Sequence, residues 1–198
     1  MATTIRKGDR RIQRTRQALI QSFKDIVREK GFTATSIQDI TERANVSRGT
    51  FYLHFTDKYT MIDEFIREDF QIHIASAIPP TSQWKRETLY LLITTMLDYF
   101  EHKYNHQKRL TPTIAPLIER AMHEELTALL LTWLNQDARP YTRVPVETIA
   151  RIAGWAVFGA AIEWSQEESA IPLDRMANDI LSVILDGITR IAPSALPA

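Results

Sequence analysis

The sequence contains no cysteine among its 198 residues. This absence excludes a disulfide framework, a zinc site built from thiolates and a cysteine nucleophile. Glycine is also scarce, with 6 residues, and neither a phosphate-cradling glycine loop nor a Gly-x-Ser-x-Gly nucleophile motif is present. The chain also lacks a paired acid motif. The sequence therefore disfavours the hypothesis that the protein is an all-helical enzyme.

Long apolar runs are missing as well. No stretch reaches the roughly 18 uninterrupted apolar residues of a membrane span, and residues 1–8 are polar and basic, unlike a signal peptide. Hydrophobic residues nevertheless make up 44% of the chain, which is enough for a packed core. These features predict a soluble, cytoplasmic protein that has no membrane partner.

The formal net charge is zero, but the charge is unevenly distributed. Residues 1–60 hold 12 Lys and Arg against 6 Asp and Glu, whereas residues 61–198 hold 12 against 18. A polyanion-binding module followed by a mildly acidic domain gives this asymmetry, and so does chance clustering of solvated charges. The zero net charge disfavours a nonspecific architectural DNA binder, because such proteins rely on overall positive charge.

Helical periodicity dominates the sequence, and no alternating strand pattern or hairpin turn interrupts it. The pattern predicts an all-α fold. An N-terminal three-helix helix-turn-helix domain is expected in residues 1–56, and a larger, dimeric helical bundle domain in residues 57–198. The expected helices cover about residues 10–30, 37–44, 48–54, a fourth from Asp57, then 82–103, 117–135, 146–166 and 172–191.

Local residues mark the ends of the first helices. Gly31 is expected to end the first helix as a left-handed cap, and the run Thr35–Gln38 reads as a capping box that opens the second. Asn45 lies where the chain must turn sharply, and asparagine tolerates left-handed dihedral angles. Ser47 is a good N-cap for the third helix.

Two short helices joined by a tight turn between Ile37 and Phe55 form a helix-turn-helix unit. In and just before the second of these helices, the apolar Val46, Phe51 and Phe55 are spaced to face the core. The remaining side is small and polar near the helix N-terminus, which lets that end enter the major groove closely. This outward side consists of Arg48, Gly49, Thr50, Tyr52 and His54.

The outward residues suit DNA chemistry. Arg48 can donate two hydrogen bonds to a guanine edge, or it can contact a phosphate instead. Thr50 can contact a thymine methyl group or a phosphate. Tyr52, His54 and Lys58 can hold backbone phosphates, although Tyr52 can also be read as a core residue.

The segment resembles the DNA-binding domain of the tetracycline-repressor-like (TetR) family over about residues 12–62. The matching positions are Gly31-Phe32, Thr35, Ile37, Ile40, Ala44, Val46-Ser47, Gly49-Thr50-Phe51-Tyr52, His54-Phe55 and Asp57-Lys58. Two positions depart from the family pattern: Asn45 stands where glycine is frequent, and Thr41 where alanine is frequent.

The resemblance implies a homodimer that binds a palindromic operator in double-stranded DNA, with a C-terminal domain for a small-molecule effector. It also implies that Thr35 or Ser36 contacts phosphate together with Tyr52, His54 and Lys58. The complete predicted DNA-binding set is Thr35, Ser36, Ser47, Arg48, Gly49, Thr50, Tyr52, His54 and Lys58. A repressor and an activator share this architecture, so both remain open.

Basic residues precede and open the first helix. They are Arg6, Lys7, Arg10, Arg11, Arg14 and Arg16. This arm can reach along or into the minor groove, or it can be a solvated tail.

The last two predicted helices are apolar on two faces, which is typical of helices that are buried on two sides. They can pair with their counterparts in a second chain as a four-helix bundle, or they can pack only within their own chain. The predicted dimer interface consists of Ala153, Val157, Ala160, Trp164, Ile180, Ile184 and Ile188.

The helices over 82–103 and 117–135 carry large apolar and amphipathic side chains that suit a ligand pocket. An aromatic stripe at helical spacing is, however, more often part of a plain core. The predicted effector pocket consists of Trp84, Met96, Tyr99, Phe100, Met122, Leu126 and Trp133. No cofactor is expected. His102 and His106 lie four residues apart, but no third ligand is in register, so no metal site is predicted either.

Overall fold

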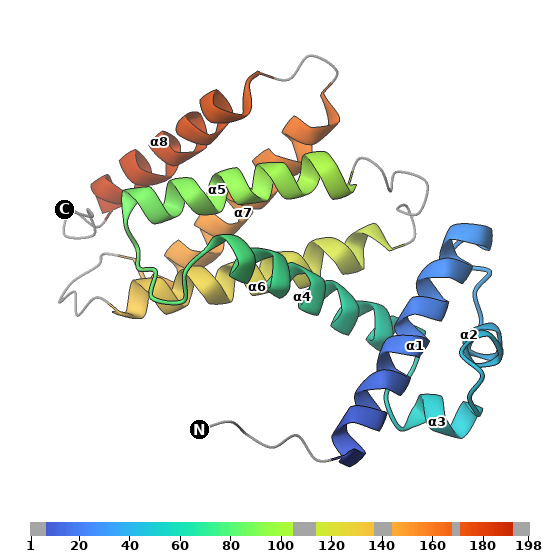
Figure 1. The fold of residues 1–198 in the computed structure, drawn as a ribbon. Helices are drawn as coiled ribbons and strands as arrows, with labels where there is room; N and C mark the ends of the chain where they lie inside the picture. The colour runs from blue at the N-terminus through green and yellow to red at the C-terminus, as the bar shows by residue number, and fades with distance from the viewer. Residues whose placement is uncertain (1–6, 105–113, 137–143, 168–170, 192–198) are drawn as a thin grey trace. The chain divides into compact units, whose positions relative to one another are not determined.

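The computed structural model describes residues 7–104, 114–136, 144–167 and 171–191, and every regular element in these ranges is helical (Figure 1). This confirms the predicted all-α class. The elements are α1 (Lys7–Lys30), α2 (Ile37–Arg43), α3 (Arg48–Tyr52), α4 (Lys58–Ala77), α5 (Arg86–Tyr99), the π-helical turn η1 (Phe100–Tyr104), α6 (Ala115–Gln136), α7 (Val146–Gln166) and α8 (Leu173–Ile191).

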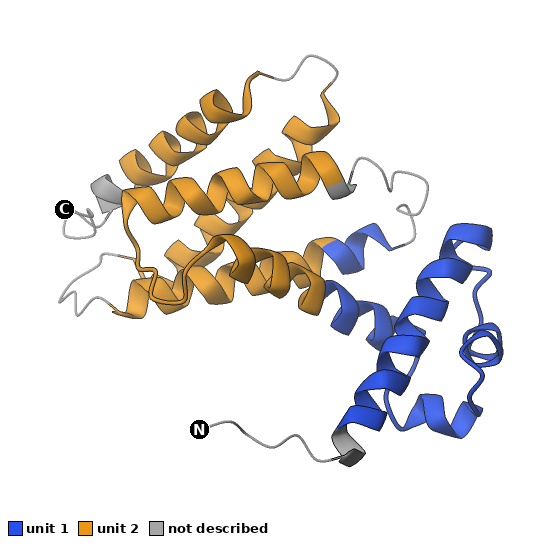
Figure 2. Cartoon of the chain, in the orientation of Figure 1, with its two compact units in different colours: residues 1–66, 109–118 blue, residues 67–108, 119–198 orange. Residues whose placement is uncertain are grey.

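The chain divides into two compact units (Figure 2). The first comprises residues 1–66 and 109–118, and the second comprises residues 67–108 and 119–198. The division therefore falls inside α4, whereas the sequence placed a boundary at residues 56/57, directly before that helix. The assignment of DNA binding to residues 1–56 and of ligand binding and dimerisation to residues 57–198 stays a prediction.

The first unit has a small apolar core. The stripe on α1 is buried from Leu19 onward, and Phe51 and Phe55 from the third helix and its end are buried as well. Ile12, which the periodicity placed on the inward face of α1, is 55% exposed, because it precedes the buried part of that helix.

The turns around α2 follow the sequence closely. Gly31 has φ 81° and Asn45 has φ 52°, so both adopt the predicted left-handed conformation. The capping box is shifted by one residue from its predicted place. Ser36 is the N-cap, and its backbone N–H donates a hydrogen bond to the Asp39 carboxylate. The Thr35 side chain is buried instead, and its hydroxyl donates to the carbonyl of Gly31.

The second unit is built around α5, which packs against α7 and α8. Leu92, Ile93 and Met96 of α5 are fully buried. The α-helix predicted for residues 82–103 is shorter than expected, since it begins at Arg86 and continues after Tyr99 as η1. On α7, a Cβ at Gly154 would lie 2.9 Å from the Thr127 hydroxyl of α6, so the absence of a side chain permits this close helix contact.

Candidate nucleic-acid interface

The third helix exposes polar and small residues at its N-terminal end. Ser47 caps it, since the Ser47 hydroxyl accepts a hydrogen bond from the backbone N–H of Thr50 at 3.1 Å, as predicted. Arg48 and Gly49 in its first turn are exposed, and a Cβ at Gly49 would meet no atom closer than 3.6 Å. No atom of the described structure therefore blocks the approach of Gly49 to a DNA groove.

Burial divides the third helix as the sequence predicted. Phe51 is fully buried and packs edge-on against the Tyr52 ring, with ring centroids 5.5 Å apart. Tyr52 itself is 57% exposed, which removes its alternative reading as a core residue. Leu53 is 85% exposed, and no role was assigned to it from the sequence. The sequence did contain a signal for the exposure of Leu53, because it lies between Tyr52 and His54, which were both predicted to face outward.

Arg48 is held from the preceding helix. Its guanidinium donates to the Gln38 side-chain oxygen at 2.7 Å, and the Gln38 amide donates to Glu42 at 2.7 Å. All three side chains are exposed. The Gln38 contact uses one of the five N–H donors of Arg48, so the others remain for a base edge or a phosphate.

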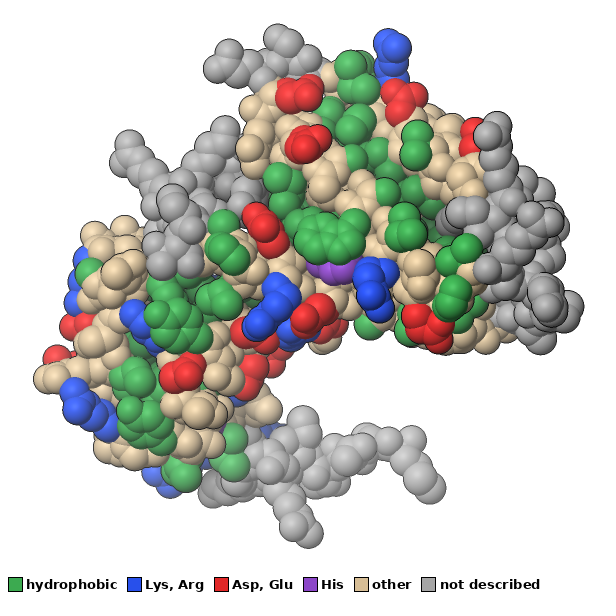
Figure 3. Space-filling view, turned by 180° about the vertical axis from the view of Figure 1, so that it is seen from behind, with side chains coloured by type: hydrophobic (Ala, Val, Ile, Leu, Met, Phe, Trp, Pro, Cys, Tyr) green, Lys and Arg blue, Asp and Glu red, His purple; other side chains and the backbone are tan. Residues whose placement is uncertain are grey.

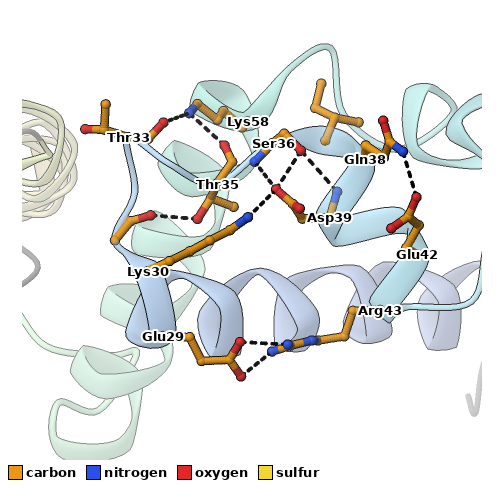
Figure 4. A network of polar contacts seen from close by, with 12 residues as sticks. Glu29, Lys30, Thr33, Thr35, Ser36, Gln38, Asp39, Glu42, Arg43 and Lys58 are labelled. Carbon is orange, nitrogen blue, oxygen red and sulfur yellow. Dashed lines mark hydrogen bonds and ion pairs between the residues drawn. The ribbon is translucent and has the colours of Figure 1, made fainter.

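Lys58, at the start of α4, faces inward in this structure. Its ammonium donates to the backbone carbonyls of Phe32 at 3.1 Å, Thr33 at 3.4 Å and Thr35 at 2.9 Å, as Figure 4 shows for the last two. It also lies 4.5 Å from the centre of the Phe32 ring. Lys58 therefore fixes the loop before α2. To make the predicted phosphate contact, its ammonium would have to give up one of these hydrogen bonds to a carbonyl and donate to a DNA phosphate instead.

The other predicted phosphate ligands differ in accessibility. Thr35 is buried and its hydroxyl proton is engaged with Gly31, at 2.7 Å. Ser36 is exposed at the N-terminus of α2, and Thr50 and His54 are partly exposed. Of the pair that the family resemblance left open, Ser36 is thus the residue that a phosphate can reach.

A polar network braces α2 against the end of α1 (Figure 4). Lys30 pairs with Asp39 at 2.7 Å, and Arg43 forms two bonds to Glu29 at 2.6 and 2.7 Å. The Lys30 ammonium, followed by the Ser36 hydroxyl and backbone N–H, holds the pKa of Asp39 well below its usual range. The carboxylate of Asp39 therefore stays charged and keeps the capping box closed at neutral pH.

The basic stretch of α1 is partly available to DNA. Arg10, Arg11 and Arg14 are exposed, whereas Arg16 pairs with Glu64 at 3.0 Å and lies 5.3 Å from the centre of the Phe55 ring. Arg6 and the side chain of Lys7 lie outside the described part of the structure. The predicted arm thus reduces, in the described residues, to three exposed arginines on the first turns of α1.

Residues 19–65, which span the helix-turn-helix unit, match the family model of bacterial regulatory proteins, tetR family. The helix-turn-helix segment of this chain is therefore similar to the DNA-binding segment of the tetR family. Along 87% of its length it is 24% identical to the HTH-type transcriptional repressor KstR2 of Rhodococcus jostii, of which it covers 90%. The fold agrees with that of the flavonoid-responsive regulator FrrA, with a TM-score of 0.61, 18% identity and coverage of 88% of this chain and 97% of FrrA.

A second solved structure of the same fold is the transcriptional regulator FadR of Bacillus subtilis, in complex with stearoyl-CoA. The TM-score is 0.54 at 17% identity, and the match covers 87% of this chain and 98% of FadR. The match of residues 19–65, the similarity to KstR2 and the geometry of the third helix together make the chain a DNA-binding transcription regulator.

The predicted effector-pocket residues of this regulator are packed in the core of the second unit. Met96, Phe100 and Leu126 are fully buried, and the whole set of seven is at most 9% exposed. Of the set, Trp133 lines a groove that is open to solvent, between α4 and α6. The residues predicted from the sequence as a pocket are therefore core residues of the second unit. The open groove is lined mostly by other residues of α6.

The predicted dimer residues are also mostly enclosed within the one chain. Ala153, Val157, Trp164, Ile180 and Ile184 are each at most 7% exposed, while Ala160 is partly exposed. The side chain of Ile188 lies outside the described part. Among the described side chains of α7 and α8, the large apolar ones that are exposed are instead Ile152, Trp155 and Val183.

No group of three or more potential metal ligands occurs in the part of the chain that the structure describes. His102 pairs with Asp98 at 3.2 Å, and His106 lies outside the described residues. Among the helices of the described ranges, none combines the length and the apolar character that a membrane span needs.

Proposed function

We propose that this regulator is a homodimeric, cytoplasmic repressor that binds a palindromic operator and leaves it when a small molecule occupies the second unit. The observation that carries the proposal is the third helix, whose capped, unobstructed N-terminus exposes Arg48 and Gly49 beside the exposed Tyr52. The name of KstR2 as a repressor supports the sign of regulation. An activator with the same architecture is the alternative.

A second copy of this chain is the partner that the second unit fits. Ile152 and Trp155 on α7 and Val183 on α8 are 62%, 50% and 71% exposed. Ile152 and Val183 line an apolar furrow of about 140 Å³ between these helices, and Ala153 and Gly187 line it as well. Hydrophobic side chains gather on a face of the second unit (Figure 3). Large exposed apolar patches of this kind mark interaction sites.

Trp155 has a defined position on this surface. Its ring stacks on the His123 ring from α6, with centroids 4.0 Å apart and an angle of 23° between the planes. A rigid, half-exposed aromatic ring is a good anchor for an interface, because little side-chain entropy remains to be lost on binding.

The homodimer is tested by replacing Val183 with lysine. We expect the molar mass in solution, measured by light scattering during size-exclusion chromatography, to fall from that of two chains to that of one at micromolar concentration. The cause is a charge placed where two apolar surfaces must meet. The matched control is Ile72→Lys, because Ile72 on α4 is similarly exposed, at 70%. A wild-type chain that is monomeric, or a V183K dimer as stable as the I72K dimer, would contradict this interface.

A further inference from the structure

The second unit contains an open groove between α4 and α6 that the sequence did not predict. Its volume is about 520 Å³, within the roughly 300–1,000 Å³ of small-molecule sites. One wall is formed by α4 and the Pro79-Pro80 turn that follows it, and the other wall by the C-terminal half of α6.

The floor of this groove is apolar and preformed. It includes Phe70, Ile74 and Ile78 from one wall and Trp133 from the other, each at most 8% exposed. The rims carry Ala75 and Ala128, whose small side chains are exposed and leave the groove open. A flat or elongated apolar body fits such a floor without moving a core residue.

The polar end of the groove offers hydrogen-bond acceptors. Glu125, which is partly buried, accepts from Arg67 on one carboxylate oxygen at 3.0 Å and from Gln71 on the other at 2.7 Å. Each of these oxygens retains acceptor capacity. Thr132 on the same helix donates its hydroxyl proton to the Ala128 carbonyl at 2.8 Å, so it too presents a lone pair to the groove.

The charge at this end is negative. Arg67 pairs with both Glu124 and Glu125, which leaves the three side chains with a net charge of −1. The described residues that line the groove include Glu125 but no Lys or Arg. An anionic ligand would therefore enter without a cation to pair it, whereas a cationic donor would complement the spare charge and the spare acceptors.

We infer that the groove binds a small apolar molecule that carries a protonated amine at one end, with the amine at Glu125 and the apolar body along Phe70, Ile74 and Trp133. The inference rests on the proposed function only for its regulatory consequence. That consequence follows from α4, which begins at Lys58 in the first unit and supplies the wall from Phe70 to Ile78 in the second.

Three probes with one apolar body test the ligand class: 1-naphthylmethylamine, 1-naphthalenemethanol and 1-naphthoate. In calorimetric titrations of the full chain without DNA, we expect the amine to bind at least about tenfold more tightly than the carboxylate, with the alcohol between them. Glu125→Gln should reduce the preference for amine over alcohol, because it removes the negative charge and keeps an acceptor.

The place of binding is tested by filling the groove. Ala128→Phe adds a ring over the floor from an exposed position, and we expect it to weaken amine binding at least about tenfold. Ala77→Phe is the matched control, since Ala77 is exposed on α4 but does not line the groove. We expect the control to bind the amine within about twofold of the wild type.

Carboxylate binding as tight as amine binding would overturn the ligand class, and equal amine affinity in A128F and the wild type would overturn the site. The absence of amine binding to the wild type would overturn both. Operator affinity separates these failures from those of the proposed function. Amine binding in the groove with unchanged operator affinity would support the site while contradicting effector release. Operator binding without any amine binding would contradict the groove proposal and still support DNA binding by the first unit.

Discussion

Arg48→Ala is expected to lower the affinity of the regulator for its operator by about 30-fold to about 20,000-fold. Each base contact contributes about 1–3 kcal/mol to discrimination, and a homodimer loses the contact in both half-sites. Affinity for unrelated DNA should change far less, because it depends on phosphates rather than on a base edge. Fluorescence anisotropy with labelled operator and unrelated duplexes at fixed salt concentration measures both quantities.

The matched control for this substitution is Arg43→Ala. Arg43 is also exposed and has the same charge, but it lies at the end of α2 and is held by Glu29. We expect R43A to retain most of the preference for the operator. If R48A instead lost equal affinity for operator and unrelated DNA, Arg48 would be a phosphate ligand, and the base-reading role would be wrong.

Phe51→Ala is expected to destabilise the first unit by about 3–5 kcal/mol and to abolish operator binding. The third helix is only 5 residues long, so its stability comes from packing rather than from intrinsic helix propensity. Phe51 is the fully buried residue on that helix, and its ring also contacts Phe55, with centroids 5.7 Å apart. Chemical denaturation followed by circular dichroism measures the loss of stability.

Leu53→Ala provides the comparison two residues further along. Its side chain is 85% exposed, so its removal should change stability by less than about 0.5 kcal/mol. A loss in F51A as small as that in L53A would show that Phe51 does not anchor the third helix.

The sequence predicted the helix-turn-helix unit well because its determinants are local. Ser47 can cap only the helix that follows it, and the left-handed turn needs a residue such as Asn45 at its position. The inward Phe51 and Phe55 and the outward Arg48 follow from helical spacing alone. For Tyr52, the spacing was compatible with both an outward position and a core position, and its exposure in the structure excludes the core position.

Interactions between distant residues were not predictable in the same way. The turn of Lys58 toward the Phe32 and Thr35 carbonyls depends on how the start of α4 meets the loop before α2. Thr35 was read as a possible phosphate ligand, although its hydroxyl closes a bond within the same loop. Neither contact leaves a periodic trace in the sequence.

The second unit shows a further limit. A helix with two apolar faces is compatible with burial in its own chain or against a partner, and Val157 and Ile180 turn out to be buried in their own chain. Similarly, Met96 and Phe100 have the size and polarity of pocket residues but pack in the core. The groove between α4 and α6 depends on small rim residues such as Ala128, which no apolar periodicity distinguishes.

In the proposed homodimer, two copies of the third helix read one palindromic DNA sequence. The most direct test is a selection of binding sites from random duplex DNA with the full chain at moderate salt. We expect one enriched inverted repeat, with half-site centres about one helical turn of 10 base pairs apart or at a related spacing, and no such enrichment with R48A. Enrichment of a single unrepeated site, or of no sequence at all, would contradict the account.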